Sequence, residues 1–205
     1  PGKTPSYKLG RHRAVCYSTD LICTGEMKDS FRTIRSVSEG QYKDRGSRFL
    51  SFALPVNGTS EIKEQLAIFR KEYHDARHHC FAWRLGPDME QYRINDDGEP
   101  SGSAGRPIFG QIQSKELTDI LVVVVRYFGG KLLGVSGLIQ AYRSAAADAL
   151  SRAEIIEKKI INQYLLQFDY SSLNEVMKLI RDLELGFTNE VYEARCAMTL
   201  NVWIR

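Results

Sequence analysis

The sequence predicts a fold of mixed helices and strands in two units, and three patterns along its 205 residues support this. Four apolar residues at helical spacing predict one buried helical stripe: Ile62, Leu66, Phe69 and Tyr73. An unbroken Leu-Val-Val-Val-Val run within 118–127 predicts a strand that is buried on both faces or lies deep inside a sheet. Strict alternation of apolar residues over 196–204 predicts a half-buried strand near the C-terminus.

The first unit is expected to contain both long helices. Its expected strands are 31–38, 48–56, 81–85, 92–94 and 118–127. Thr59 or Ser60 is expected to cap the first helix, because both residue types cap helices well. A short helix is expected near Ser103 and a long one over 135–153.

The second unit follows a charged connector at 154–159. Strands are expected at 164–170, 187–193 and 196–204, and a capping box of Ser172 and Glu175 opens the helix between the first two. This order is β-α-β-β, whereas a ferredoxin-like module has one more helix and strand. The module is therefore expected to be either incomplete or exposed on one side. The resulting domains are a flexible tail at 1–28, a large domain at 29–153 and a small one at 160–205.

Composition indicates a soluble globular protein, with 43% apolar and 26% charged residues and a net charge of +3. The longest aliphatic run, 120–125, is far short of the ~20 residues that cross a bilayer, so we expect no membrane segment. Four cysteines without CxxC spacing predict reduced thiols and a cytoplasmic protein. Basic residues outnumber acidic ones in residues 1–48, which permits contact with RNA or an acidic partner.

Two glycine-rich segments have the composition of anion-binding loops. Gly129, Gly130, Lys131 and Gly134 precede a helix, and 102–106 ends in an arginine. Neither segment is a P-loop, because leucine follows the Gly-Lys pair. The alternative is that these glycines only permit tight turns and close packing.

Asp96, Asp97 and Glu99 form an acidic turn that could hold a divalent cation or supply an acid/base pair. The alternative is a solvated turn, since Asn-Asp-Asp-Gly is strong turn chemistry. His74 and His78 are four residues apart, but the helix is expected to end before His78 and no second ligand pair appears. We therefore expect no metal and no cofactor.

Three longer motifs, DARHHC at 75–80, DDGEPSGSAGRP at 96–107 and VVVRYFGGKLLGVSGLIQAY at 123–142, resemble those of the YigZ/Impact family. The resemblance extends from about residue 31 to the end of the chain. It implies a two-domain α+β protein. The N-terminal domain would be a two-layer α/β sandwich like domain four of elongation factor G and the GHMP kinases, and the C-terminal domain a ferredoxin-like elongation-factor module.

The family resemblance also implies a role in translation, which eukaryotic Impact-type members regulate. Their kinase-pathway role is not transferred, because the partner-binding domain that precedes this fold in them has no counterpart in the sequence. The motif positions carried over are Arg77, His78, His79, Asp96, Asp97, Glu99, Arg106, Pro107, Arg126, Tyr127, Gly129, Gly130, Lys131, Gly134 and Tyr142.

The leading hypothesis is a non-enzymatic, translation-associated protein whose three motifs meet around one hollow that binds RNA, the ribosome or a protein partner. The acidic residues are expected to pair with the motif arginines. The alternative is an enzyme acting on a phosphorylated small molecule or nucleotide in the same cleft, with Asp97 or Glu99 and His78 as acid and base. A third reading is an adaptor whose motifs serve only packing and turns.

Overall fold

The computed structural model describes residues 8–9, 12–13, 15–18 and 29–203, and the chain divides into two compact units. The larger unit comprises residues 30–158, and the smaller one the described parts of 1–29 and 159–205. Both units combine antiparallel sheets with helices, which confirms the expected α+β class. No helix in the described ranges is long and apolar enough to cross a membrane.

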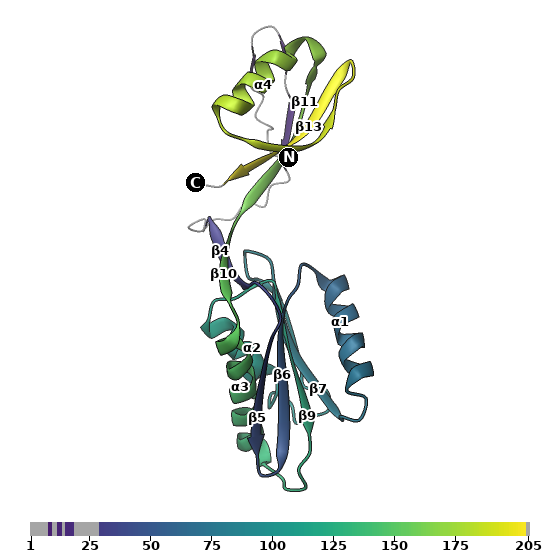
Figure 1. The fold of residues 1–205 in the computed structure, drawn as a ribbon, viewed down its shortest axis with the longest axis vertical. Coiled ribbons are helices and arrows are strands. Elements are labelled where there is room, and N and C mark those ends of the chain that lie inside the picture. Colours follow the sequence, from purple (N-terminus) through teal and green to yellow (C-terminus); the bar gives the residue numbers. More distant parts are fainter. Residues whose placement is uncertain (1–7, 10–11, 14, 19–28, 204–205) are drawn as a thin grey trace. The chain divides into compact units, whose positions relative to one another are not determined.

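A five-stranded antiparallel sheet in the order β5-β6-β9-β7-β8 forms the centre of the larger unit (Figure 1). Its strands are β5 (Ser38–Asp44), β6 (Ser47–Pro55), β7 (His78–Leu85), β8 (Gln91–Asn95) and β9 (Ile120–Tyr127). The helices are α1 (Thr59–Glu72), α2 (Gly105–Ser114) and α3 (Gly134–Arg152), and β4 (Ser30–Ile34) pairs with β10 (Ile155–Lys159) outside the main sheet.

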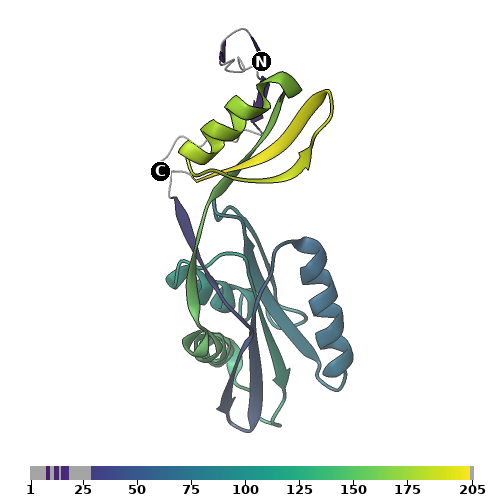
Figure 2. The same ribbon diagram turned by 45° about the horizontal axis from the view of Figure 1, so that its top comes forward.

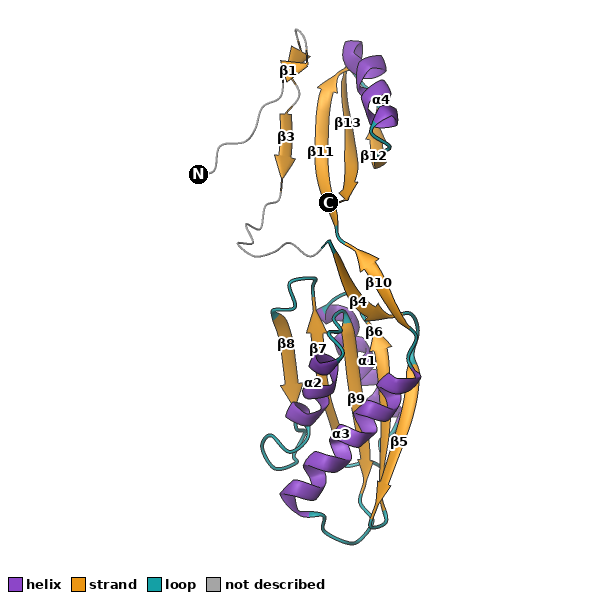
Figure 3. Ribbon diagram, turned by 90° about the vertical axis from the view of Figure 1, so that its left-hand side faces the viewer, coloured by secondary structure: helices purple, strands orange, loops and turns teal. Residues whose placement is uncertain are grey.

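The central strand β9 supplies side chains to two separate cores. Ile120, Val122 and Val124 lie in the core that α2 and α3 cover. Leu121 and Val123 point to the opposite face, where α1 covers a second core. Figures 2 and 3 show these helices on the two faces of the sheet. The structure thus adds a third layer to the two-layer sandwich expected, and it confirms that β9 is buried on both faces.

Strand β5 was not expected as a separate element, because only one short strand was predicted over 31–38. Its outward residues are polar, and its inward Gly40 lies so close to α3 that a Cβ there would overlap the backbone of Ala149. A strand held by such a close approach has no run of large apolar residues, so the apolar pattern misses it.

The smaller unit contains β11 (Ile161–Asp169), a 3₁₀ turn (Tyr170–Ser172), α4 (Leu173–Asp182), β12 (Gly186–Val191) and β13 (Arg195–Trp203). The expected order β-α-β-β is therefore confirmed. Its sheet has the order β12-β13-β11-β3, in which the short strand β3 (Val15–Ser18) pairs with the free edge of β11. No strand was expected there, because residues 1–28 were predicted to be a flexible tail; most of that expected tail lies outside the described residues.

Two predicted helix caps are wrong. The N-cap of α1 is Gly58 rather than Thr59 or Ser60, and the capping box at the start of α4 is not formed. Ser172 occupies the N-cap position, but its side chain makes no cap hydrogen bond and its Oγ is buried without a partner. The preceding 3₁₀ turn gives Ser172 a φ of −94° and a ψ of 1°, outside the extended conformation that a capping side chain needs.

Candidate functional site

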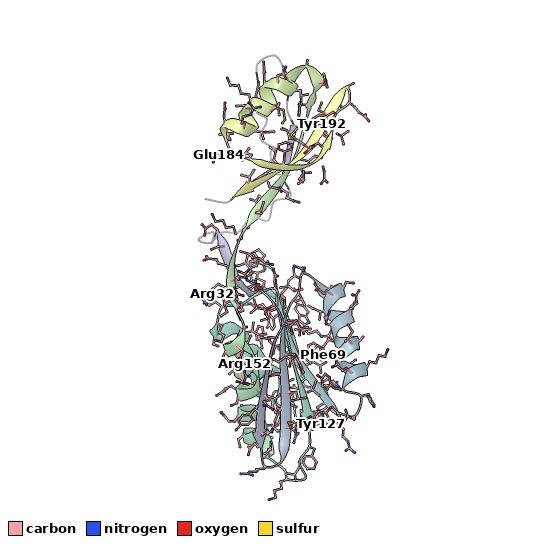
Figure 4. The ribbon with its side chains drawn as sticks, viewed as in Figure 1. Arg32, Phe69, Tyr127, Arg152, Glu184 and Tyr192 are labelled. Carbon is pink, nitrogen blue, oxygen red and sulfur yellow. The ribbon has the colours of Figure 1, made fainter. Side chains whose placement is uncertain are left out.

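Strand register brings the DARHHC and RYFGG motifs together at one end of the main sheet. His78 lies opposite Arg126 on β9, and Arg126 lies opposite Phe49 on β6. One residue further, Tyr127 lies opposite Arg48. Figure 4 shows Tyr127 at this end of the larger unit. Residues almost fifty positions apart in the chain therefore share one row of the sheet.

A hollow of about 690 Å³ opens at this end, and we call it the first hollow. Its lining residues are Asp75, Ala76, Arg77, His78, Arg126, Tyr127, Phe128 and Leu132. The Arg48 guanidinium lies over the Tyr127 ring at 5.1 Å, and that of Arg126 lies 5.7 Å from the Phe128 ring centre. Guanidinium groups and aromatic rings thus lie in cation–π contact at this hollow.

Arg126 is held in place by a buried carboxylate. Its Nη1 lies 2.6 Å from Glu99 Oε1, and the two side chains are only 7% and 4% exposed. The Tyr142 hydroxyl donates to the same Glu99 oxygen at 2.7 Å. The expected pairing of the acidic residues with the motif arginines is confirmed for Glu99; Asp97 instead lies near Arg70, and Asp96 accepts backbone N–H groups. One Arg126 nitrogen, Nε, is buried without a partner in the structure.

The buried network continues from Tyr142 to Cys80. The Cys80 Sγ lies 3.3 Å from the Tyr142 hydroxyl and 3.0 Å from the Asp96 carbonyl oxygen, to which it donates. Burial raises the pKa of the Cys80 thiol and of the Tyr142 phenol, and the nearby Glu99 adds to both shifts. Both groups therefore stay protonated at neutral pH and serve as hydrogen-bond donors rather than as nucleophiles.

The acidic turn (residues 95–105) folds back on itself around Asp96. The Asp96 carboxylate accepts hydrogen bonds from the backbone N–H groups of Gly102, Ala104 and Gly105 at 2.8–2.9 Å, where α2 begins. Burial alone would raise the pKa of Asp96, but these three donors, with Arg106 nearby, outweigh it and lower that pKa. The Asp96 carboxylate is thus fully hydrogen-bonded within its own turn.

Asp97 and both histidines lock the acidic turn to β7. The His79 backbone N–H donates to Asp97 Oδ2 at 2.7 Å, and His78 Nδ1 donates to the Asp97 carbonyl oxygen at 2.9 Å. The two imidazoles lie on opposite faces of β7, and His79 Nε2 donates to the Tyr73 carbonyl oxygen at 3.1 Å. His78 therefore lines the first hollow, whereas His79 is buried behind it.

The glycine–lysine loop (residues 128–134) follows β9 directly, and its Phe128 and Leu132 line the first hollow. Gly129 is fixed against the β5–β6 turn, since its N–H donates to Ser47 Oγ and a Cβ on it would overlap the Gly46 backbone. Gly130 and Gly134 have φ values of +84° and +72° with open space around them. Phe128 and Leu132 are 55% and 83% exposed, and Lys131 is also exposed.

A single hollow formed by all three motifs was expected, and this expectation is wrong. None of the three carboxylates of the acidic turn lines the first hollow. Each is instead bound by backbone N–H groups or by the Arg126 side chain. Arg106 lines a different hollow of about 440 Å³ between α2 and α3, the second hollow. The first hollow therefore receives the sequence-predicted residues Arg77, His78, Arg126 and Tyr127.

Sequence reasoning missed several contributors to this site. Asp75 accepts a hydrogen bond from the Tyr127 hydroxyl at 2.8 Å, and Arg70 lies 3.6 Å from Asp97. Phe128 carried the clearest signal, an aromatic side chain next to two glycines. Arg48 had none, because only the pairing of β6 with β9 places it over Tyr127. No three His, Cys, Asp or Glu side chains among the described residues gather as a metal site requires.

Comparison with known proteins extends the similarity beyond these motifs. Residues 45–150 match the family described as the Impact N-terminal domain. The chain is 37% identical over 150 residues to the IMPACT family member YigZ of Escherichia coli (strain K12), covering 72% of this chain and 74% of that protein. It is 32% identical over 156 residues to YvyE of Bacillus subtilis (strain 168), covering 76% and 72%. A crystal structure of a hypothetical protein superimposes with a TM-score of 0.72 at 31% identity, covering 86% of each chain.

Proposed function

This chain belongs to the Impact family, and we propose that it is a cytoplasmic, translation-associated binding protein whose first hollow holds a single strand of RNA. The translation setting comes from the family resemblance. The observation that carries the choice of ligand is the sequence Arg126-Tyr127-Phe128 at the end of β9. The Arg126 guanidinium lies 5.7 Å from the centre of the Phe128 ring, and Tyr127 and Phe128 both line the hollow.

Charge at this end of the sheet favours a polyanion. Arg126 and Glu99 neutralise one another, and Asp75 offsets one further positive charge. Arg77, Arg48 and Lys131 then leave the hollow and its rim with an excess of positive charge. Basic side chains that follow a strand of phosphates give affinity without reading the bases.

The exposed ring of Phe128 supplies the second requirement for single-strand binding. Phe128 is more than half exposed, and Tyr127 lines the hollow beneath the Arg48 guanidinium. Unpaired bases stack on such platforms at about 1–3 kcal/mol per base. Exposed Leu132 adds an apolar surface beside Phe128.

The geometry supports binding over the enzyme alternative. The enzyme alternative needs the carboxylate of Asp97 or Glu99 to face His78 across the hollow. Glu99 is instead buried against Arg126, and the Asp97 carboxylate accepts the His79 backbone N–H. His78 directs its Nδ1 to a backbone carbonyl rather than to a carboxylate.

Fluorescence anisotropy with a short single-stranded RNA, measured over a range of salt concentrations, tests the proposal. We expect a steep loss of affinity with salt, and Arg77→Gln should weaken binding about tenfold and lower the salt slope by about one. Phe128→Ala should weaken binding about tenfold while leaving the salt slope unchanged. Arg93→Gln on β8 is the matched control, because Arg93 is exposed but lies away from the hollow. Absence of RNA binding, or equal binding by all variants, would refute the proposal.

A further inference from the structure

The second hollow lies between α2 and α3 and is separate from the first. Its polar lining is Arg106 and Gln111 from α2 and Arg143 from α3, and Pro107 and Ile139 supply apolar walls. Figure 3 shows the two helices side by side on the sheet. Their exposed arginines therefore reach one concave surface from neighbouring helices.

Neither arginine of the second hollow forms an ion pair with another described residue. Asp96 is the charge that acts on Arg106, through space and without an ion pair. Its carboxylate is already saturated by three backbone N–H groups. Both guanidinium groups therefore keep their donors free for an external anion.

Gly110 is a second feature that points to a ligand site between these arginines, because it keeps the hollow open. It lies in the interior of α2, where glycine disfavours the helix relative to alanine. The structure gives no packing reason for it, since a Cβ at Gly110 would meet nothing within 4 Å. By contrast, Gly137 of α3 lies tightly against Leu133. Gly110 lines the second hollow, so a side chain there would fill the hollow instead of the core.

We propose that the second hollow binds a phosphoryl group, with Arg106 and Arg143 as its ligands and Gly110 as the open floor. Two guanidinium groups match the two negative charges of a terminal phosphoryl group, as in a phosphate monoester or a diphosphate, and each can donate two parallel hydrogen bonds. Gln111 adds a neutral donor. The remainder of an organic phosphate would lie against Pro107 and Ile139.

Isothermal titration calorimetry of the full chain at low salt, with inorganic pyrophosphate and with ADP as probes, tests this assignment. If the phosphoryl group belongs to a free organic phosphate, wild type should bind at least one probe with a saturable 1:1 isotherm. Arg143→Gln should weaken that binding at least tenfold, and Gly110→Leu should abolish it by filling the hollow. Arg93→Gln, an exposed arginine on β8, is the control and should bind like wild type.

Thermal unfolding separates loss of the site from loss of the fold. Gly110→Ala should raise Tm by a few degrees, because alanine favours the helix and nothing opposes its methyl group. A lower Tm for Gly110→Ala would show a structural role for this glycine and overturn the premise. Arg143→Gln is expected to leave Tm unchanged, so its binding defect reports the site alone.

Two sources could supply the phosphoryl group, a free organic phosphate or an RNA backbone. Binding of pyrophosphate or ADP identifies the first. If a short single-stranded RNA binds more weakly to Arg143→Gln than to Arg93→Gln while neither small probe binds wild type, the second applies. Binding of no phosphate by wild type, or undiminished binding by both Arg143→Gln and Gly110→Leu, would overturn the proposal. The first hollow is tested separately, because Arg77→Gln leaves the second hollow intact.

Discussion

The acidic turn and the glycine–lysine loop are both rich in glycine and charge, yet the protein uses them in opposite ways. Every carboxylate of the acidic turn is bound by backbone N–H groups, an arginine or a tyrosine of the same unit. In the glycine–lysine loop, Phe128, Lys131 and Leu132 face solvent. The first segment therefore holds Arg126 and His78 of the first hollow in place, whereas the second exposes side chains that a partner could contact.

This difference shows that a dense motif does not by itself mark contact with a ligand. The carboxylates of the acidic turn position Arg126 and the start of α2, so their effect on binding is indirect. Substitutions in the turn should act chiefly on stability, and substitutions at the loop tip chiefly on binding.

The largest effect is expected from Glu99→Gln. It leaves Arg126 buried without a compensating charge, which should lower the free energy of unfolding by about 3–5 kcal/mol. Urea denaturation measures this loss. Glu90→Gln at an exposed position is the control and should change stability by less than about 0.5 kcal/mol. The double variant Glu99→Leu/Arg126→Met should recover much of the loss, since no unpaired charge remains; failure to recover would contradict this account.

Gly129→Ala should cause the next largest loss of stability. It is an exception to the rule that substitutions in the glycine–lysine loop act chiefly on binding. Its methyl group would overlap the Gly46 backbone, so we expect a loss of about 2–4 kcal/mol in urea denaturation. Gly130→Ala, with open space but a positive φ, should cost only about 1–2 kcal/mol. Equal losses of stability at both glycines would show that Gly129 is not packed against the Gly46 backbone.

Asp96→Asn should cost about 2 kcal/mol at neutral pH, because an amide accepts the three backbone N–H groups less well than a carboxylate. The folded protein lowers the pKa of Asp96, so this contribution is complete above its unfolded pKa of about 3.9. It is lost as pH falls from about 3.9 through the lower folded pKa. Urea denaturation of wild type and variant should therefore converge in this acidic range. A constant difference down to pH 2 would contradict the assignment.

Leu132→Ser should have the smallest effect on stability, within about 0.5 kcal/mol, because its side chain is 83% exposed. RNA affinity measured by anisotropy should nevertheless fall about threefold, since the apolar surface beside Phe128 is lost. A stability loss above 1 kcal/mol would mean that the loop tip packs on the protein.

The sequence predicted most elements of the fold because periodic apolar residues mark them. Strand β9 and the stripe on α1 follow their expected patterns. Strand β5 escaped prediction because its contact with α3 depends on the absence of a side chain at Gly40. The cap of α4 was misjudged because the preceding 3₁₀ turn, which the local pattern does not signal, changes the backbone at Ser172.

The site was less predictable than the fold. Motif composition identified Arg77, His78, Arg126 and Tyr127, and the structure brings these four to one hollow. It could not reveal that Arg106 lies in a different hollow, because that depends on how α2 packs beside α3. Motif composition also could not distinguish a carboxylate that is paired with the protein's own groups from a carboxylate that is free to bind a ligand.

The burial of β9 on both faces has a consequence for motion at the first hollow. Amides of a strand with neighbours on both edges and helices over both faces exchange with solvent only in large openings of a domain. Arg126 and Tyr127 belong to this strand. The floor of the hollow is therefore preorganised, and an incoming strand of nucleic acid would lose entropy mainly in its own ordering rather than in that of the protein.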